Sequence, residues 1–142
     1  MNHSNNSRAR QTVTPPLRVF LVEDSADVRA LLAEDLAQIP GLALTGFADT
    51  ENDALQQLRR QAWDILILDI QLSQGNGIHL LRKLSEDDKL ADKLKIIFSN
   101  HVGNAYRRIS EQYGVRYFFD KSSDFLQLHC LLEQFGSGAS LR

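Results

Sequence analysis

The chain has 142 residues, of which 16 are Lys or Arg and 18 are Asp or Glu, so its formal net charge is −2. A charge so close to balance gives no general attraction to phosphate backbones or anionic membranes, which argues against a nucleic-acid-binding protein. Its one cysteine, Cys130, cannot form an internal disulfide, and its apolar runs are shorter than the roughly 18 residues that a membrane-spanning helix needs. No apolar stretch follows Arg8 and Arg10 to make a signal peptide. We therefore expect a cytoplasmic protein with no membrane partner.

The two ends of the chain differ in composition from its middle. Residues 1–16 are rich in Asn, Ser and Thr and end in two prolines, which favours a flexible amino-terminal tail. Residues 136–142 begin with Gly and Ser and predict a short flexible tail at the carboxyl end. Residues 17–135 remain as a single domain, which is long enough to bury a sizeable hydrophobic core.

Five short apolar runs predict β-strands. They occupy residues 18–22, 42–47, 65–68, 94–98 and 115–119. The third run is apolar at every position instead of alternating, as expected for a strand of a parallel sheet that helices cover on both faces. It is therefore expected at the centre of the sheet.

A segment with apolar residues at helical spacing follows each strand. The second of these segments begins at Thr50, which together with Asp53 resembles a capping box. The fourth is expected to end at Gly114. The residues expected to face the core are, helix by helix, Val28, Leu31, Leu32, Leu36 and Ile39; Ala54, Leu55 and Leu58; Leu80, Leu81 and Leu84; Ala105, Tyr106 and Ile109; and Phe125, Leu128, Leu131, Leu132 and Phe135.

Five strand–helix units in alternation predict an α/β fold with a parallel sheet and helices on both faces, joined by right-handed crossovers. The chain is too short for a barrel of eight such units. In open sheets of this class, ligands bind beyond the carboxyl ends of the strands. Polar residues directly after the strands are therefore the candidates for function.

Four of the five predicted strands end in polar residues. Glu23 and Asp24 follow the first, Asp69 the third, Ser99 the fourth, and Lys121 closes the fifth. A single Asp or Ser after a strand is commonly a helix cap, but several carboxylates at one edge of a sheet would repel one another unless a cation balances them. The sequence therefore predicts a cation site at this edge.

Magnesium suits this set of residues best, because it takes oxygen ligands and is commonly held by one or two carboxylates together with a phosphate. Lys121 supplies a second positive charge, and Ser99 can donate a hydrogen bond to a phosphoryl oxygen. The chemistry that uses all of these groups is attack by a carboxylate on phosphorus to form an aspartyl phosphate. Asp69 is the expected nucleophile, since it ends the most apolar strand.

Four stretches of the chain, taken in order and at their spacing, resemble the receiver domain of two-component response regulators. They are residues 19–24, 66–72, 96–99 and 118–121, with Gly77 eight residues after Asp69. The resemblance implies a flavodoxin-like (βα)5 fold with strand order 2-1-3-4-5. It also implies phosphorylation of Asp69, with Mg²⁺ held by Asp24, Asp69 and the backbone carbonyl of Gln71, and with Glu23 acting directly or through water.

The resemblance further implies that Ser99 and Lys121 bind the phosphoryl group. Phe118 stands at the aromatic position whose rotamer couples phosphorylation to a partner surface in this family, although a half-buried aromatic of the strand is the simpler interpretation. One departure from the family pattern is Ser122, which stands where a cis proline usually follows the lysine. Because a non-proline cis bond costs about 2.5–4 kcal/mol, the sequence leaves the Lys121–Ser122 bond open between cis and trans, and a trans bond would give this loop a different shape.

Other departures affect the surroundings of the phosphorylation site. Ser73 replaces a common proline and predicts a less rigid loop. Asn100 stands where the family usually has a small residue, and Gln71 and His101 occupy variable positions that tune the loss of the phosphoryl group. We therefore expect a long-lived phosphoryl group on Asp69.

These features predict a phosphoacceptor that receives a phosphoryl group from a histidine kinase or a histidine phosphotransfer protein. It would signal to a downstream protein, as a monomer or a weak homodimer, without a DNA-binding or enzymatic output domain. The main alternative is a receiver-like interaction module that binds partners without being phosphorylated. A metabolic phosphatase is disfavoured, because such enzymes generally need a second Asp at the position of Gln71.

Overall fold

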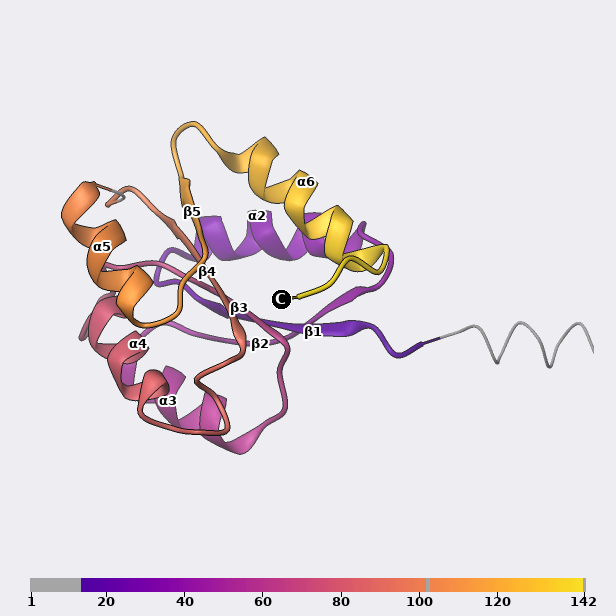
Figure 1. Ribbon diagram of the computed structural model, residues 1–142. Helices are drawn as coiled ribbons and strands as arrows, with labels where there is room; N and C mark the ends of the chain where they lie inside the picture. The colour runs from indigo at the N-terminus through magenta and orange to yellow at the C-terminus, as the bar shows by residue number, and fades with distance from the viewer. Residues whose placement is uncertain (1–13, 102, 142) are drawn as a thin grey trace, which may run out of the picture.

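A computed structural model describes residues 14–101 and 103–141 of the chain, which form one parallel sheet flanked by helices (Figure 1). The strands are β1 (Leu17–Val22), β2 (Leu42–Ala48), β3 (Ile65–Leu68), β4 (Leu94–Ser99) and β5 (Tyr117–Asp120). The helices are α2 (Ala26–Ala37), α3 (Glu51–Arg60), α4 (Gly77–Ser85), α5 (Asn104–Gln112) and α6 (Phe125–Gly136). Most of the predicted amino-terminal tail, residues 1–13, lies outside the described residues.

The sheet has the order β2-β1-β3-β4-β5, and every neighbouring pair is parallel. The predicted doubly wound, flavodoxin-like fold is therefore confirmed. The fifth strand starts two residues later than expected, at Tyr117, while Val115 is buried just ahead of it. All four residues of β3 are buried, in agreement with the central position predicted for this strand.

Helices cover the sheet on both faces, with α2 and α6 on one side and α3, α4 and α5 on the other (Figure 1). The side chains of β1 alternate between two core clusters, since Val19 and Leu21 join one cluster and Phe20 and Val22 join the other. This division explains why strands without polar alternation are stable here: each face is shielded by its own helices.

Three helix starts are capped by side chains of residues that follow a strand or its loop. Ser25 Oγ accepts from the Val28 amide at 3.2 Å, Thr50 Oγ1 from Asp53 at 3.2 Å, and Asn76 Oδ1 from His79 at 2.8 Å. These bonds satisfy amides that have no partner within the helix. They fix where α2, α3 and α4 leave the carboxyl edge of the sheet.

The expectation for the buried side of α5 is wrong. Ala105 is exposed, and Tyr106 and Ile109 keep 40% and 39% of their surface exposed, whereas Ser110 is fully buried. The helix packs beside α4 and reaches β5, the four-residue strand at the edge of the sheet, through Arg107 over Phe118, so little apolar surface is available for it to cover. Leu31 of α2 is also misassigned, since it is 48% exposed while its neighbour Leu32 is buried.

At the amino-terminal edge of the sheet, the end of α6 packs backbone to backbone against the turn after α2. A Cβ on Gly41 would lie 2.0 Å from the carbonyl oxygen of Gly136, and Gly41 has a φ of +89°, so glycine is required there. Farther along, Leu141 packs against the α2 and α6 side of the core, and its carbonyl accepts a hydrogen bond from Arg116 at 3.0 Å.

Within residues 14–101 and 103–141, none of the helices combines the length and hydrophobicity that a membrane crossing requires.

Candidate functional site

Asp69 lies at the centre of a polar cluster at the carboxyl edge of the sheet. Its Oδ1 accepts hydrogen bonds from Ser99 Oγ at 2.5 Å and from the Ile70 amide at 2.7 Å, and its Oδ2 accepts from Lys121 Nζ at 2.6 Å. The three donors come from β4, from the loop after β3 and from the end of β5. The parallel sheet thus brings together residues that lie 30 and 52 positions from Asp69 in the chain.

Lys121 bridges two carboxylates, because its Nζ also lies 2.8 Å from Glu23 Oε1. Burial disfavours the ammonium, but the hydrogen bonds to Asp69 and Glu23 outweigh that cost and raise the pKa of Lys121 above its ordinary value. Glu23 is only 2% exposed, and burial raises its pKa in spite of the bonds from Lys121 and from the Ser25 amide. The lysine is therefore held as a cation between two acids.

Asp24 completes a group of three acids. One carboxylate oxygen each from Glu23, Asp24 and Asp69 lie within 4.8 Å of one another, with Asp24 exposed and the other two buried. When ionised, the three carboxylates outnumber the single ammonium of Lys121, and their hard oxygen donors fit a divalent cation such as Mg²⁺. The donor chemistry thus agrees with the predicted metal, and Glu23, Asp24 and Asp69 are the residues that would hold it.

A cavity of about 290 Å³ opens onto this group and gives access to Asp69. Besides Asp24 and Asp69, its walls are made by Gln71, Leu72, Asn100 and His101. The three residues predicted to tune the loss of the phosphoryl group therefore all line the entrance. The Asn100 side chain is exposed at this entrance.

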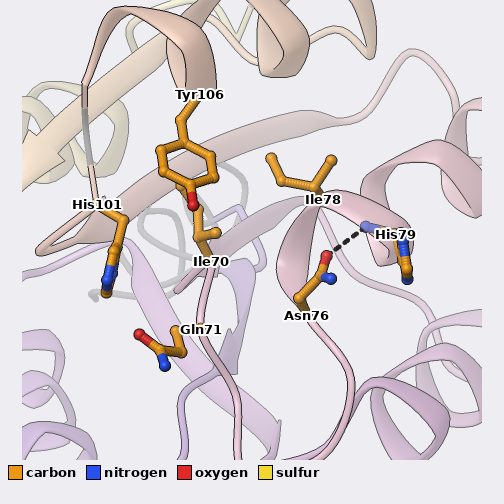
Figure 2. Close-up of a pocket in the computed structure, with 7 residues that line it drawn as sticks. All are labelled: Ile70, Gln71, Asn76, Ile78, His79, His101 and Tyr106. Carbon is orange, nitrogen blue, oxygen red and sulfur yellow. Dashed lines mark hydrogen bonds between the residues drawn. The ribbon is translucent and has the colours of Figure 1, made fainter.

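A second cavity, of about 470 Å³, lies beside the first and shares Gln71 and His101 with it (Figure 2). The amide of His101 donates to Ser99 Oγ at 3.1 Å, while its buried Nδ1 has no hydrogen-bond partner. Tyr106 and Ile70 both line this cavity, and the Tyr106 ring stands edge-on to His101 at a centroid distance of 6.1 Å. The backbone amide of His101 is thus hydrogen-bonded directly to the Ser99 hydroxyl, which in turn contacts Asp69.

Phe118 lies apart from the acidic cluster. It is half-buried, packs against the core on the α3 and α4 side, and has the guanidinium of Arg107 4.9 Å from the centre of its ring. Its placement on β5 beside α5 is compatible with either role that the sequence leaves open for it.

A family model described as the response regulator receiver domain matches residues 19–133 of the chain. The chain belongs to this family. That range includes each of the polar residues gathered around Asp69.

Two solved receiver structures illustrate the similarity. The response regulator domain of CheB from Thermotoga maritima is 26% identical, with a TM-score of 0.73 over 87% of this chain and 96% of that one. A two-component response regulator of the LuxR family from Aurantimonas sp. SI85-9A1 is 27% identical, with a TM-score of 0.75 over 87% of this chain and 86% of that one.

Among curated proteins, the chain resembles enzymes named protein-glutamate methylesterase/protein-glutamine glutaminase. The match to the one from Anaeromyxobacter dehalogenans is 42% identical over 84 residues, which are 59% of this chain and 22% of that protein. The match to the one from Treponema denticola is 38% identical over 51% of this chain and 19% of that protein. The chain thus spans about a fifth of the length of these relatives.

The described residues contain no cis peptide bond, so the Lys121–Ser122 bond, which the sequence left open, is trans and the loop departs from the receiver pattern. Asp120 Oδ1 accepts from both the amide and the hydroxyl of Ser122, at 2.8 and 2.6 Å, and these bonds lower the pKa of Asp120. Asp124 Oδ2 accepts from the Asp120 amide at 2.9 Å. Side-chain hydrogen bonds therefore shape the turn that proline usually shapes in this receiver family.

Sequence reasoning missed two groups that order the receiver site. The Ile70 amide is a donor to Asp69, and Arg29 of α2 donates to the carbonyl oxygen of Glu23 at 2.8 Å. A backbone amide leaves no mark in a sequence. Arg29 lies one helical turn after Ser25, where an arginine is ordinarily a solvated residue, so its contact with the site could not be read from its position.

Proposed function

We propose that this receiver domain accepts a phosphoryl group on Asp69, from a histidine kinase or a histidine phosphotransfer protein, in the presence of Mg²⁺. The observation that carries the proposal is the environment of the Asp69 carboxylate. One oxygen bonds to the Ser99 hydroxyl and the other to the Lys121 ammonium, beside an open acidic cavity. A carboxylate held this way is both oriented and accessible to a phosphodonor.

In the proposed transfer, an Asp69 oxygen attacks the phosphorus of a phosphohistidine. A P–O bond to Asp69 forms while the P–N bond to the donor imidazole breaks, and a proton returns to that imidazole. Lys121 and Ser99, which now contact the Asp69 oxygens, are placed to bond to phosphoryl oxygens as negative charge shifts onto them. Bound Mg²⁺ would supply charge neutralisation, held by Glu23, Asp24, Asp69 and the carbonyl of Gln71.

Output is proposed to pass through contacts with a downstream protein. Ser99 joins the phosphorylation site to β4, and Phe118 lies on the neighbouring strand under Arg107 of α5. Repacking of Ser99 and Phe118 would alter the surface of α5, whose Tyr106 and Ile109 face solvent. A monomer or weak homodimer and a cytoplasmic location stay predictions.

The esterase and glutaminase activities named for the relatives are not transferred to this chain, because the matches cover about a fifth of those proteins. A signalling role without catalysis of a metabolic reaction stays the prediction for the receiver domain described here. The slow loss of the phosphoryl group likewise rests on Asn100, Gln71 and His101, which line the cavity that water would use.

The experiment is incubation of the purified protein with acetyl phosphate and Mg²⁺, followed by intact mass spectrometry. A gain of about 80 Da is expected for one phosphoryl group, and the gain should be absent in Asp69→Asn. No adduct on the wild type would instead favour the unphosphorylated interaction module. The half-life of the adduct after removal of acetyl phosphate tests the predicted stability, and a value of seconds would contradict it.

A further inference from the structure

Glu51 is a buried carboxylate that the phosphorylation chemistry does not use. It is the first residue of α3 and is 7% exposed. Its Oε1 accepts from the Asn76 amide at 3.1 Å, and its Oε2 accepts from Lys83 Nζ at 2.6 Å. His79 Nδ1 lies 3.8 Å from Oε1. Every one of these partners belongs to the end of the loop after Asp69 or to α4, so the carboxylate ties that segment to α3.

The backbone reinforces this connection between α3 and the loop. The Glu51 amide donates to the Gln74 carbonyl at 3.0 Å, within a bridge between Thr50 and Gln74. Gly75 has a φ of +81°, and a Cβ there would lie 2.4 Å from the Cβ of Glu51. The loop therefore rests directly on Glu51, with no space for a side chain between them.

Gln71 and Asn76 face each other across the same loop. They form an isolated antiparallel bridge, and just beyond it the Gly77 amide donates to the Ile70 carbonyl at 2.6 Å. Figure 2 shows Gln71 on one strand of the loop and Asn76 on the other, where Asn76 also caps His79. Because Glu51 holds the Asn76 amide and Asn76 pairs with Gln71, Glu51 fixes the backbone at Gln71 without touching it.

We propose that Glu51 is a positioning residue for the cation site, acting through Asn76 to hold the backbone carbonyl of Gln71 where it can bind Mg²⁺. The inference rests on the proposed function, which assigns that carbonyl to the metal. Burial raises the pKa of Glu51, but the hydrogen bonds from Lys83 and the Asn76 amide outweigh burial and lower it overall, which keeps the carboxylate ionised at neutral pH. An ionised, paired carboxylate gives the loop a single rigid anchor.

The test is Glu51→Gln, which keeps the shape of the side chain and removes its charge. Isothermal titration calorimetry of the full chain with MgCl₂ should show affinity weakened by about tenfold, as is typical when a residue that orients a metal ligand is lost. In phosphorylation by acetyl phosphate, the Mg²⁺ concentration for half-maximal rate should rise by about the same factor, while the rate at saturating Mg²⁺ stays within about twofold of wild type. A purely structural role would not separate these two quantities.

Asp64→Asn is the matched control. Asp64 also accepts from a backbone amide and from a cationic side chain, both of Arg18, but it lies at the opposite end of β3 from Asp69. This variant should lose stability and bind Mg²⁺ like the wild type. Gly75→Ala provides an independent route, since its Cβ would push the loop away from an intact Glu51 and should weaken Mg²⁺ binding as Glu51→Gln does.

Wild-type Mg²⁺ affinity in both Glu51→Gln and Gly75→Ala would overturn the inference, whether or not their unfolding temperatures fall. This failure differs from failure of the proposed function, which would appear as absence of the phosphoryl adduct in the wild type. If Glu51→Gln does not fold, Gly75→Ala alone decides, because its carboxylate and ion pair remain.

Discussion

Two lysines at opposite ends of the sheet are both withdrawn from solvent, but their partners differ. At the carboxyl edge, Lys121 Nζ lies between the carboxylates of Glu23 and Asp69, beside an open cavity. At the amino edge, Lys95 is fully buried, and its Nζ donates to the carbonyl oxygens of Leu90, Ala91 and Lys93 at 2.9 Å each. One lysine is paired with charges and the other with backbone dipoles.

The titration of the two lysines moves in opposite directions. Carboxylate partners raise the pKa of Lys121, whereas burial lowers the pKa of Lys95 to about 8, with the charge of Asp92 opposing the shift. The partners of Lys95 are backbone carbonyls, which hold its ammonium group in one position. Those of Lys121 are side-chain carboxylates beside an open cavity, which the proposed Mg²⁺ and phosphoryl group would enter. The partners of a lysine withdrawn from solvent, more than its burial, thus decide the direction in which its pKa moves.

Replacement of Lys121 should have the largest effect. In Lys121→Met, the rate of phosphorylation by acetyl phosphate should fall by about 10²-fold or more, because a preorganised donor to the phosphoryl oxygens is lost. Affinity for Mg²⁺ should be retained or increased, since Glu23 and Asp69 lose their competing cation. Rates from intact mass spectrometry and affinities from calorimetry test both parts. An undiminished rate would remove Lys121 from the proposed chemistry.

Replacement of Lys95 should affect stability alone. Lys95→Met leaves three carbonyls, one buried and two part-buried, without their donor, so the free energy of unfolding should fall by about 1–3 kcal/mol. The rate of phosphorylation on Asp69 should stay at the wild-type value. Urea denaturation and the acetyl phosphate assay measure the two quantities. A slower phosphoryl transfer in a folded Lys95→Met protein would contradict the prediction that Lys95 has a purely structural role.

The pH dependence of stability should carry the signature of Lys95. Its pKa is about 8 in the folded chain and near the ordinary 10.5 when unfolded, so between these pH values the unfolded state binds more protons. The free energy of unfolding of the wild type should therefore rise with pH across this window relative to Lys95→Met. Denaturation of both proteins at pH 7.5 and pH 10 gives the difference. A constant difference would mean that the carbonyl bonds cancel the effect of burial.

Replacement of Asp64 should have the smallest effect. Asp64 binds the exposed Arg18 through three hydrogen bonds, and exposed ion pairs contribute only about 0.2–1 kcal/mol. Asp64→Asn should lower the free energy of unfolding within that range, and the loss should shrink as salt is added. Urea denaturation at low and high ionic strength measures it. A larger loss that does not depend on salt would place Asp64 among the buried structural groups, beside Lys95.

The carboxyl edge of the sheet could be predicted far better than the amino edge. Asp69, Ser99 and Lys121 each follow an apolar run, and parallel strands bring their ends together, so local patterns were enough to predict their meeting. Lys95 falls inside the predicted run 94–98, where nothing in the sequence shows that carbonyls of the preceding turn surround it. Contacts of this kind depend on the path of a turn, which no periodicity encodes.

The buried faces of the helices are predicted correctly for α4 and wrongly for α5, because burial also depends on contacts that the sequence pattern does not show. The stripe Leu80, Leu81 and Leu84 is predicted correctly, because α4 packs between α3 and α5 and buries all three side chains in the core on this side of the sheet. Tyr106 and Ile109 have equally regular spacing, but α5 lies at the edge, where β5 has four residues and offers little surface to cover. Spacing defines which residues share a face, and the neighbours decide how much of that face is buried.

The backbone contact between Gly41 and Gly136 has a practical consequence for measurement. It holds the end of α6 at the amino edge of the sheet, and Leu17, which starts β1, lies at the same edge, where its amide donates to the Gly41 carbonyl at 2.8 Å. Linkers attached at either end of the described chain therefore depart from the side opposite the acidic cavity. Immobilisation on a sensor surface through such a linker would leave Asp69 facing the flowing solution.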